Sequence, residues 1–192
     1  MKNWKIVLGL IIMVIMVSAC VKKESSTGSA TEEIKKLIVY YSLTGNTEFA
    51  AEYIQFLTSA DILKLELIEP YPVEFEAVIA KLNIEREAGI LPELNSRVDN
   101  LADYDIIFLG TPNWFGTLSS PLLAFLASHD LSGKTIVPFV TFGRGGFQNT
   151  ITDLKNALPD SVILEEFGVA GAEVENSKED ILQWLSRIDM IK

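Results

Sequence analysis

Residues 37–47 read LIVYYSLTGNT, and this stretch decides the fold of the chain. Its first five residues form an unbroken apolar and aromatic run, which is typical of a strand buried on both faces of a parallel sheet. A short polar loop follows, and helical spacing of apolar residues begins at Thr47 and continues to Leu57. The segment therefore predicts a strand, a tight loop and a helix in direct succession.

The loop has the composition of a phosphate-binding site. Backbone N–H groups at the start of a helix attract anions, and Ser42, Thr44, Asn46 and Thr47 add polar side chains. Gly45 allows close approach of the backbone. The loop, which also contains Leu43, has no lysine or arginine, and neither GxxxxGK[ST] nor GxGxxG occurs in the chain. We expect one phosphate held by neutral donors without a metal; the simpler alternative is a helix cap in a polar loop.

The rest of the sequence alternates strand and helix patterns. Further strands are expected at 62–68, 106–109, 135–141 and 162–169, and further helices at 75–88, 121–128, 149–157 and 178–188. This alternation predicts an α/β fold, a doubly wound parallel sheet with helices on both faces. Pro138 lies inside the fourth expected strand, where it removes a backbone donor, so we expect a bulge or an unpaired position there.

Two more loops are expected to lie beside the first, because doubly wound sheets bind ligands at the carboxyl ends of their strands. The loop after the third strand contributes the candidates Thr111, Pro112, Asn113, Trp114, Phe115 and Gly116. The loop after the fourth strand contributes Thr141, Phe142, Gly143, Arg144, Gly145 and Gly146. The alternatives are that the two aromatic residues belong to the core or to a surface patch, and that Arg144 is simply exposed. No catalytic acid–base set stands out.

These motifs resemble those of a known family. Ser42 to Thr47 matches the phosphate-loop pattern of flavodoxins, [ST]-x-[ST]-G-N-T, placed after a strand and before a helix. The Pro70-Tyr71-Pro72 segment, with Glu85 or Glu87 and the later Leu91-Pro92-Glu93-Leu94, resembles a bacterial subfamily of flavodoxin-like flavoproteins. The resemblance covers residues 37–192. It implies a five-stranded sheet of order 2-1-3-4-5 and FMN as the cofactor.

The resemblance also implies roles for individual residues. Residues 42–47 would hold the FMN phosphate, Trp114 would contact the flavin ring with Phe115 second, and the Gly116 peptide would bond flavin N5. The glycine-rich loop at 141–146 would donate N–H groups to the pyrimidine edge. Arg144 departs from the acidic or neutral residues usual there, and we expect its charge to stabilise the anionic reduced flavin and to raise the potential.

The first 20 residues, MKNWKIVLGLIIMVIMVSAC, have the pattern of a secretory leader. Lys2 and Lys5 precede an apolar run of about a dozen residues, which is short for a membrane-spanning helix of roughly 20. The run ends in Val-Ser-Ala-Cys, which resembles the bacterial lipobox and predicts a signal peptide with lipidation at Cys20. A plain signal peptide and an uncleaved anchor are the alternatives. Residues 21–36 are polar and predict a flexible tether to the domain at 37–192.

Composition limits the partners. The chain has 16 basic and 26 acidic residues, a formal charge of −10, and this surface repels nucleic acid. One cysteine and one histidine exclude a disulfide framework and most cysteine or histidine metal sites. We expect an extracytoplasmic protein, lipid-anchored to the bacterial membrane, that exchanges electrons with a redox partner protein or a quinone. The alternatives are an FMN-dependent NAD(P)H or quinone reductase, and a non-enzymatic lipoprotein that binds a phosphorylated ligand.

Overall fold

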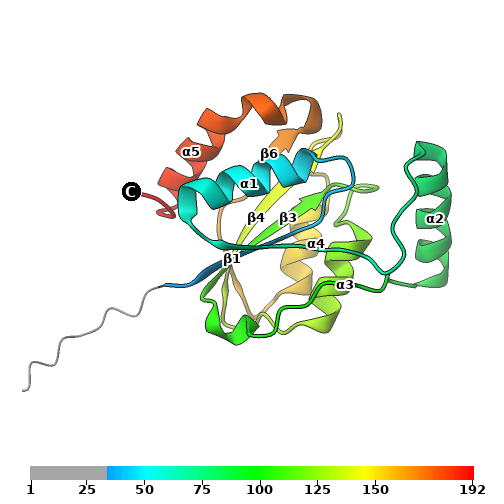
Figure 1. Cartoon of the computed structure of the whole chain (residues 1–192), viewed down its shortest axis with the longest axis horizontal. Coiled ribbons are helices and arrows are strands. Elements are labelled where there is room, and N and C mark those ends of the chain that lie inside the picture. The colour runs from blue at the N-terminus through cyan, green and yellow to red at the C-terminus, as the bar shows by residue number, and fades with distance from the viewer. Residues whose placement is uncertain (1–33) are drawn as a thin grey trace, which may run out of the picture. The chain divides into compact units, whose positions relative to one another are not determined.

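A parallel sheet forms the centre of residues 34–192, which are the residues that the computed structural model describes (Figure 1). Its strands are β1 (Lys36–Tyr40), β2 (Asp61–Lys64), β3 (Ile106–Pro112), β4 (Thr135–Phe142), β5 (Val162–Ile163) and β6 (Phe167–Ala170). Their order is β2-β1-β3-β4-β5, and β6 also pairs with β4. The predicted fold class and the predicted order 2-1-3-4-5 are thus confirmed.

Helices cover both faces of this sheet (Figure 1). Within residues 34–192 the α-helices are α1 (Asn46–Thr58), α2 (Phe75–Ala88), α3 (Ser120–Ser128), α4 (Thr150–Ala157) and α5 (Lys178–Arg187), and the 3-10 helices are η1 (Leu101–Asp103) and η2 (Gly171–Asn176). Alternate residues of β1 serve the two cores: Ile38 and Tyr40 pack with α1 and α5, whereas Leu37 and Val39 pack with α3 and α4. The unbroken apolar run of β1 is explained by this burial on both faces.

The second strand is shorter than the sequence predicted. The alternating residues 62–68 were expected to form one strand, but β2 ends at Lys64. Leu67 instead forms an antiparallel bridge with Leu94, and the Ile68 N–H donates to the Glu93 carbonyl over 3.0 Å. Alternation predicts an extended chain with two different faces, and it does not specify which neighbour that chain pairs with.

The strand predicted at 162–169 is divided into β5 and β6 at the level of Pro138. Ile136 pairs with Ile163 and Phe139 with Phe167, so the outer strand takes four residue steps where β4 takes three. Residues two apart on a strand point their backbone groups to the same neighbour, so Pro138, like Ile136, faces this outer strand. The extra residue lies where Pro138 offers no N–H, and the expected bulge is confirmed.

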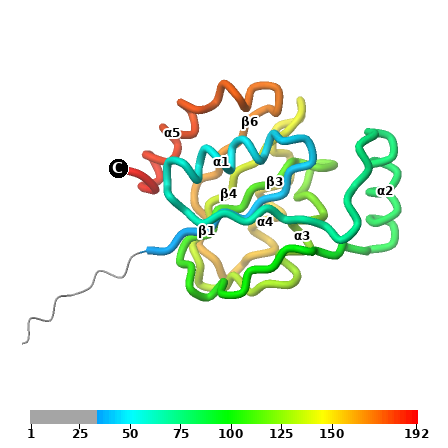
Figure 2. The backbone as a smooth tube through the Cα atoms, viewed as in Figure 1, coloured from blue at the N-terminus to red at the C-terminus, as the bar shows by residue number. Residues whose placement is uncertain are grey.

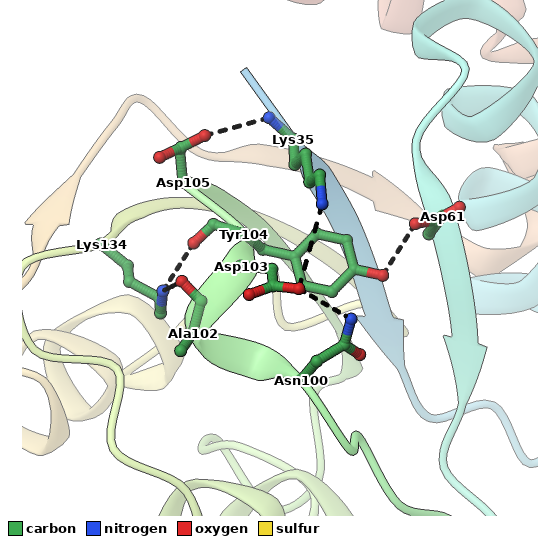
Figure 3. Close-up of polar contacts among 8 residues, drawn as sticks. All are labelled: Lys35, Asp61, Asn100, Ala102, Asp103, Tyr104, Asp105 and Lys134. Atoms are coloured by element: carbon green, nitrogen blue, oxygen red, sulfur yellow. Dashed lines mark hydrogen bonds and ion pairs between the residues drawn. The ribbon is translucent and has the colours of Figure 1, made fainter. Parts of the chain in front are cut away.

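The amino ends of the strands are joined by a polar cluster (Figure 3). The Tyr104 hydroxyl donates to Asp61 at 2.7 Å, and the Lys134 ammonium donates to the Tyr104 carbonyl at 2.6 Å. The backbone N–H of Lys35 donates to Asp105. These contacts connect the amino ends of the four strands β1, β2, β3 and β4, at the end of the sheet opposite to the candidate site. We therefore assign them a structural role.

Some predictions lie outside the described residues. These are the signal peptide, the lipidation of Cys20 and most of the tether. The tether was expected to end at Lys36, but Lys36 is already the first residue of β1. Within residues 34–192, no helix has the length and apolar character that a membrane crossing requires.

Candidate functional site

The loop between β1 and α1 presents free backbone donors at the start of a helix. Gly45 adopts φ +90°, a conformation that favours glycine, and its N–H donates to the Ser42 hydroxyl over 3.1 Å. The first helical hydrogen bond runs from Phe49 to Gly45, so the N–H groups of Thr44, Asn46 and Thr47 have no acceptor among residues 34–192. Unpaired donors of this kind suit an anion, and none of the loop residues is basic.

The three predicted loops are joined by hydrogen bonds at the carboxyl ends of the strands. The buried hydroxyls of Thr47 and Thr141 lie 2.8 Å apart and connect the first loop to the third. The Asn113 side chain donates to the carbonyls of Gly146 and Phe147 at 2.8 and 3.0 Å, which connects the second loop to the third. The sequence therefore placed these loops correctly beside one another.

Together the loops open into one cavity of about 1230 Å³. The predicted site residues that line it are Ser42, Leu43, Thr44, Asn46, Thr47, Pro112, Asn113, Trp114, Phe115, Thr141, Phe142 and Gly143. Thr111, Gly45, Gly116, Arg144, Gly145 and Gly146 are not among its lining residues. Thr111 is buried and bonds the Ser119 hydroxyl at 2.9 Å, so it shapes the loop from behind. Arg144 is exposed, and its proposed influence on the flavin stays a prediction.

The second loop contains a tight turn with Phe115 and Gly116 at its centre. Trp114 and Thr117 exchange two backbone hydrogen bonds of 3.1 Å, and the central residues have φ +52° and +85°. The Gly116 N–H donates to the Asn113 carboxamide oxygen, and its carbonyl accepts from Asn149. Both polar groups of Gly116 are thus in use inside the protein. The Gly116 carbonyl oxygen can accept a second hydrogen bond, so the predicted bond to flavin N5 does not require an existing bond to break, and it stays a prediction.

Part of the cavity wall was not among the predicted site residues. The segment after β2 and the inner side of α2 contribute Leu65, Leu67, Pro70, Tyr71, Pro72, Val78, Ile79 and Leu82. Gly171 and Ala172, directly after β6, also line the cavity. The rule that ligands bind at the carboxyl ends of strands could have found this second pair. The α2 residues gave no such signal, because their position depends on how a long connection folds back.

An aromatic cluster forms one corner of the cavity. The Trp114 ring lies edge-on to Tyr41 and Tyr71, with centroid distances of 5.4 and 5.1 Å. The Tyr71 hydroxyl donates to the Glu85 carboxylate at 2.5 Å, and Glu85 is only 8% exposed. Glu85 is therefore the partner of Tyr71, a contact that the sequence analysis did not predict.

The surroundings raise the pKa of both tyrosines. Burial raises the pKa of Tyr41 to about 12, and the nearby Glu85 charge adds to the effect. Burial, followed by the hydrogen bond to Glu85, raises the pKa of Tyr71 well above its usual value. Lys64 and Glu66 are the charged residues on the cavity wall, and Lys64 forms an ion pair with Glu48 at 2.7 Å. The cavity thus offers mainly neutral donors and apolar surface.

A doubly wound parallel sheet with loops meeting at its carboxyl edge defines a class of ligand-binding α/β proteins. Within that class, the family model described as Flavodoxin matches residues 35–188. The chain belongs to the flavodoxin family.

Solved structures support this assignment. A protein of Bacteroides eggerthii, provisionally named a flavoprotein, is 28% identical with a TM-score of 0.71, and the match covers 82% of this chain and 99% of that one. A similarly named protein of Bacteroides uniformis is 26% identical with a TM-score of 0.71, over 81% and 99% of the two chains. A Lactobacillus acidophilus flavoprotein, solved in complex with FMN, shares the fold at 22% identity and a TM-score of 0.58, over 75% and 98%.

Proposed function

We propose that this chain is an FMN-dependent electron-transfer protein that works at the outer face of the bacterial membrane. Its cofactor follows from its family, since flavodoxins bind FMN. The observation that carries the proposal is the meeting of the three loops in one cavity, with unpaired N–H groups at one end and aromatic rings near the other. Bound FMN supplies the redox chemistry, whereas the protein binds and orients it.

The proposed residue roles follow the order of the loops. Thr44, Asn46 and Thr47 would donate to the phosphate, which fits a monophosphate held by neutral groups. Trp114 and Phe115 would contact the ring, and residues 141–143 would border it. The Thr47–Thr141 hydrogen bond would fix the distance between the phosphate end and the ring end.

The test is the visible spectrum of the chain starting at Val21. We expect a flavin spectrum and release of FMN on denaturation. Thr44→Asp places a carboxylate at the phosphate end, and charge repulsion should weaken FMN binding by about tenfold or more. Ser59→Asp adds the same charge at the other end of α1, where the residue is also exposed, and should leave binding unchanged.

Colourless protein that takes up no added FMN would contradict the proposal. It would favour the alternative of a non-enzymatic lipoprotein for another phosphorylated ligand. Equal weakening by both charge variants would contradict the assigned phosphate end.

The location is a separate part of the proposal and rests on the leader sequence. Cys20 is the one cysteine of the chain and follows Val-Ser-Ala after an apolar run. Labelling of bacterial cells with radioactive palmitate should mark the wild-type protein, and Cys20→Ala should abolish the label. Ser25→Ala, in the expected tether, is the matched control and should keep it. A label that survives Cys20→Ala would contradict lipidation at this residue.

A reductase is the second candidate function, favoured by the apolar wall that α2 adds to the cavity. An electron carrier needs only the exposed edge of its cofactor, whereas a reductase needs space for a second substrate. The partner is then a small molecule such as a quinone rather than a redox protein.

The proposed role of Arg144 is tested by the midpoint potential of the bound flavin. Arg144→Ala should lower this potential if the charge of Arg144 acts on the flavin, and an unchanged potential would reject that role.

A further inference from the structure

The cavity extends beyond the three loops into an apolar space beside α2, which we call the α2 compartment. Its walls are Leu65, Leu67, Tyr71, Val78, Ile79 and Leu82. Sites for one small ligand usually measure roughly 300–1,000 Å³, and the whole cavity, at about 1230 Å³, is larger. There is therefore room for a second molecule beside a cofactor held by the loops.

The walls indicate an uncharged, flat molecule. Lys64 and Glu66 are the charged residues along the described cavity wall, and the charge of Lys64 is already paired with Glu48. The aromatic cluster of Tyr41, Tyr71 and Trp114 offers ring faces and edges, which favour aromatic ligands. The six residues that form the α2 compartment carry no charge, so a charged substrate would lose hydration there without gaining an ionic partner.

The Tyr41 hydroxyl is an available hydrogen-bond donor beside these rings. The Tyr71 proton is directed to Glu85, but the Tyr41 hydroxyl has no partner among residues 34–192. In that part of the chain, Thr150 Oγ1 is the one fully enclosed side-chain polar atom without a hydrogen bond, so the Tyr41 hydroxyl is not sealed inside the protein. Tyr41 lines the cavity, and its hydroxyl can donate to a carbonyl oxygen there.

We infer that the α2 compartment binds a molecule of the quinone class, with its ring against the aromatic cluster and a carbonyl oxygen accepting from Tyr41. Glu85 acts as a positioning residue, because its hydrogen bond fixes the Tyr71 ring and directs the Tyr71 proton away from the ligand. The inference rests on the proposed function, since the loops must hold FMN beside the compartment.

Equilibrium dialysis of 2-methyl-1,4-naphthoquinone against oxidised, FMN-loaded protein starting at Val21 tests the inference. This form contains no cysteine, so the quinone has no thiol to react with. We expect one binding site per chain with FMN retained. Ile79→Trp fills the compartment and should weaken quinone binding at least tenfold. Ile84→Trp makes the same change on the same helix at a residue that is 66% exposed, and should leave binding within twofold.

Tyr41→Phe keeps the ring and removes the donor, so it should weaken quinone binding about three- to tenfold while FMN stays bound. Glu85→Gln keeps the shape of its side chain and should restore most of the quinone affinity that Glu85→Ala loses. Three results would each overturn the inference: no binding to FMN-loaded protein, displacement of FMN by the quinone, or equal weakening by Ile79→Trp and Ile84→Trp.

Failure of the proposed function gives a different result. The wild-type protein would then take up no FMN, and the dialysis would be repeated on the FMN-free protein. Quinone binding to the FMN-free protein, with the same losses of affinity in the same variants, would support the α2 compartment as a quinone site without supporting FMN binding. Absence of quinone binding there as well would overturn both.

Discussion

Helices α1 and α2 follow neighbouring strands and have similar lengths, 13 and 14 residues, yet they serve different purposes. In α1, Ala50, Ala51 and Ile54 are fully buried against the sheet. In α2, Phe75 and Ile84 are 72% and 66% exposed. The backbone view shows α1 lying along the sheet and α2 set off to one side (Figure 2).

This difference separates the scaffold of the site from its adaptable wall. The start of α1 carries the loop with free N–H groups, so its position must be fixed by the core for a phosphate to be bound. The inner side of α2 lines the cavity, so its side chains there are less completely covered by protein than those of α1. A strand followed by a helix can thus form either the fixed support of the phosphate loop or the wall of the cavity.

Removal of core packing from α1 should have the largest effect. Ile54→Ala takes three carbons from a fully buried site and should lower the free energy of unfolding by about 2–5 kcal/mol. Ile84→Ala makes the same change on exposed α2 and should alter it by less than about 0.5 kcal/mol. Urea unfolding measures both values. Similar losses in the two variants would show that α2 is packed as tightly as α1.

The hydrogen bond between Thr47 and Thr141 gives the next prediction. Thr47→Val leaves the buried Thr141 hydroxyl unpaired and should cost about 1–3 kcal/mol of stability and about tenfold in FMN affinity. Thr58→Val, at the other end of α1, removes a hydroxyl that donates to the Ile54 carbonyl. Its effect should be confined to stability. Equal loss of FMN affinity in both would indicate a general loosening of α1.

Raising the pH above 10 should lower the free energy of unfolding, and Tyr41 should contribute to this loss. Its folded-state pKa of about 12 lies above the usual tyrosine pKa of 10.0, so this contribution to stability is complete below pH 10 and is lost as the pH rises toward 12. The loss should be roughly 1.4 kcal/mol per pH unit. Urea unfolding at several pH values should give a shallower decline for Tyr41→Phe than for the wild type. Parallel declines would exclude Tyr41 as a source.

The same contrast explains what the sequence could predict. The loop before α1 and the helices carry their signals within a few consecutive residues, as apolar spacing, a glycine and polar donors. The wall formed by α2 depends on contacts such as Tyr71 with Glu85, 14 residues apart, and on residues 66–68 leaving the sheet to pair near Leu94. A sequence pattern shows that these residues are apolar or extended, and the folded connection decides what they face.

The contact between Arg86 and Phe115 should give the smallest effect. The guanidinium lies 4.7 Å from the ring centroid and joins α2 to the turn of the second loop. Such a pair at an exposed site contributes about 0.5–1 kcal/mol. Alanine and arginine are both good helix formers, so Arg86→Ala should leave the helix itself intact. Global stability should therefore change by no more than the energy of this contact.

Hydrogen–deuterium exchange can resolve an effect of this size because it reports on each helix separately. In Arg86→Ala, amides of α2 should exchange about two- to fivefold faster, the factor that this energy corresponds to, while α1 stays unchanged. Glu87→Ala changes the next residue, also exposed, and should leave α2 as it is. Faster exchange in both helices would mean that α2 and the sheet open as one unit, and the cavity wall would then be as rigid as the scaffold beside it.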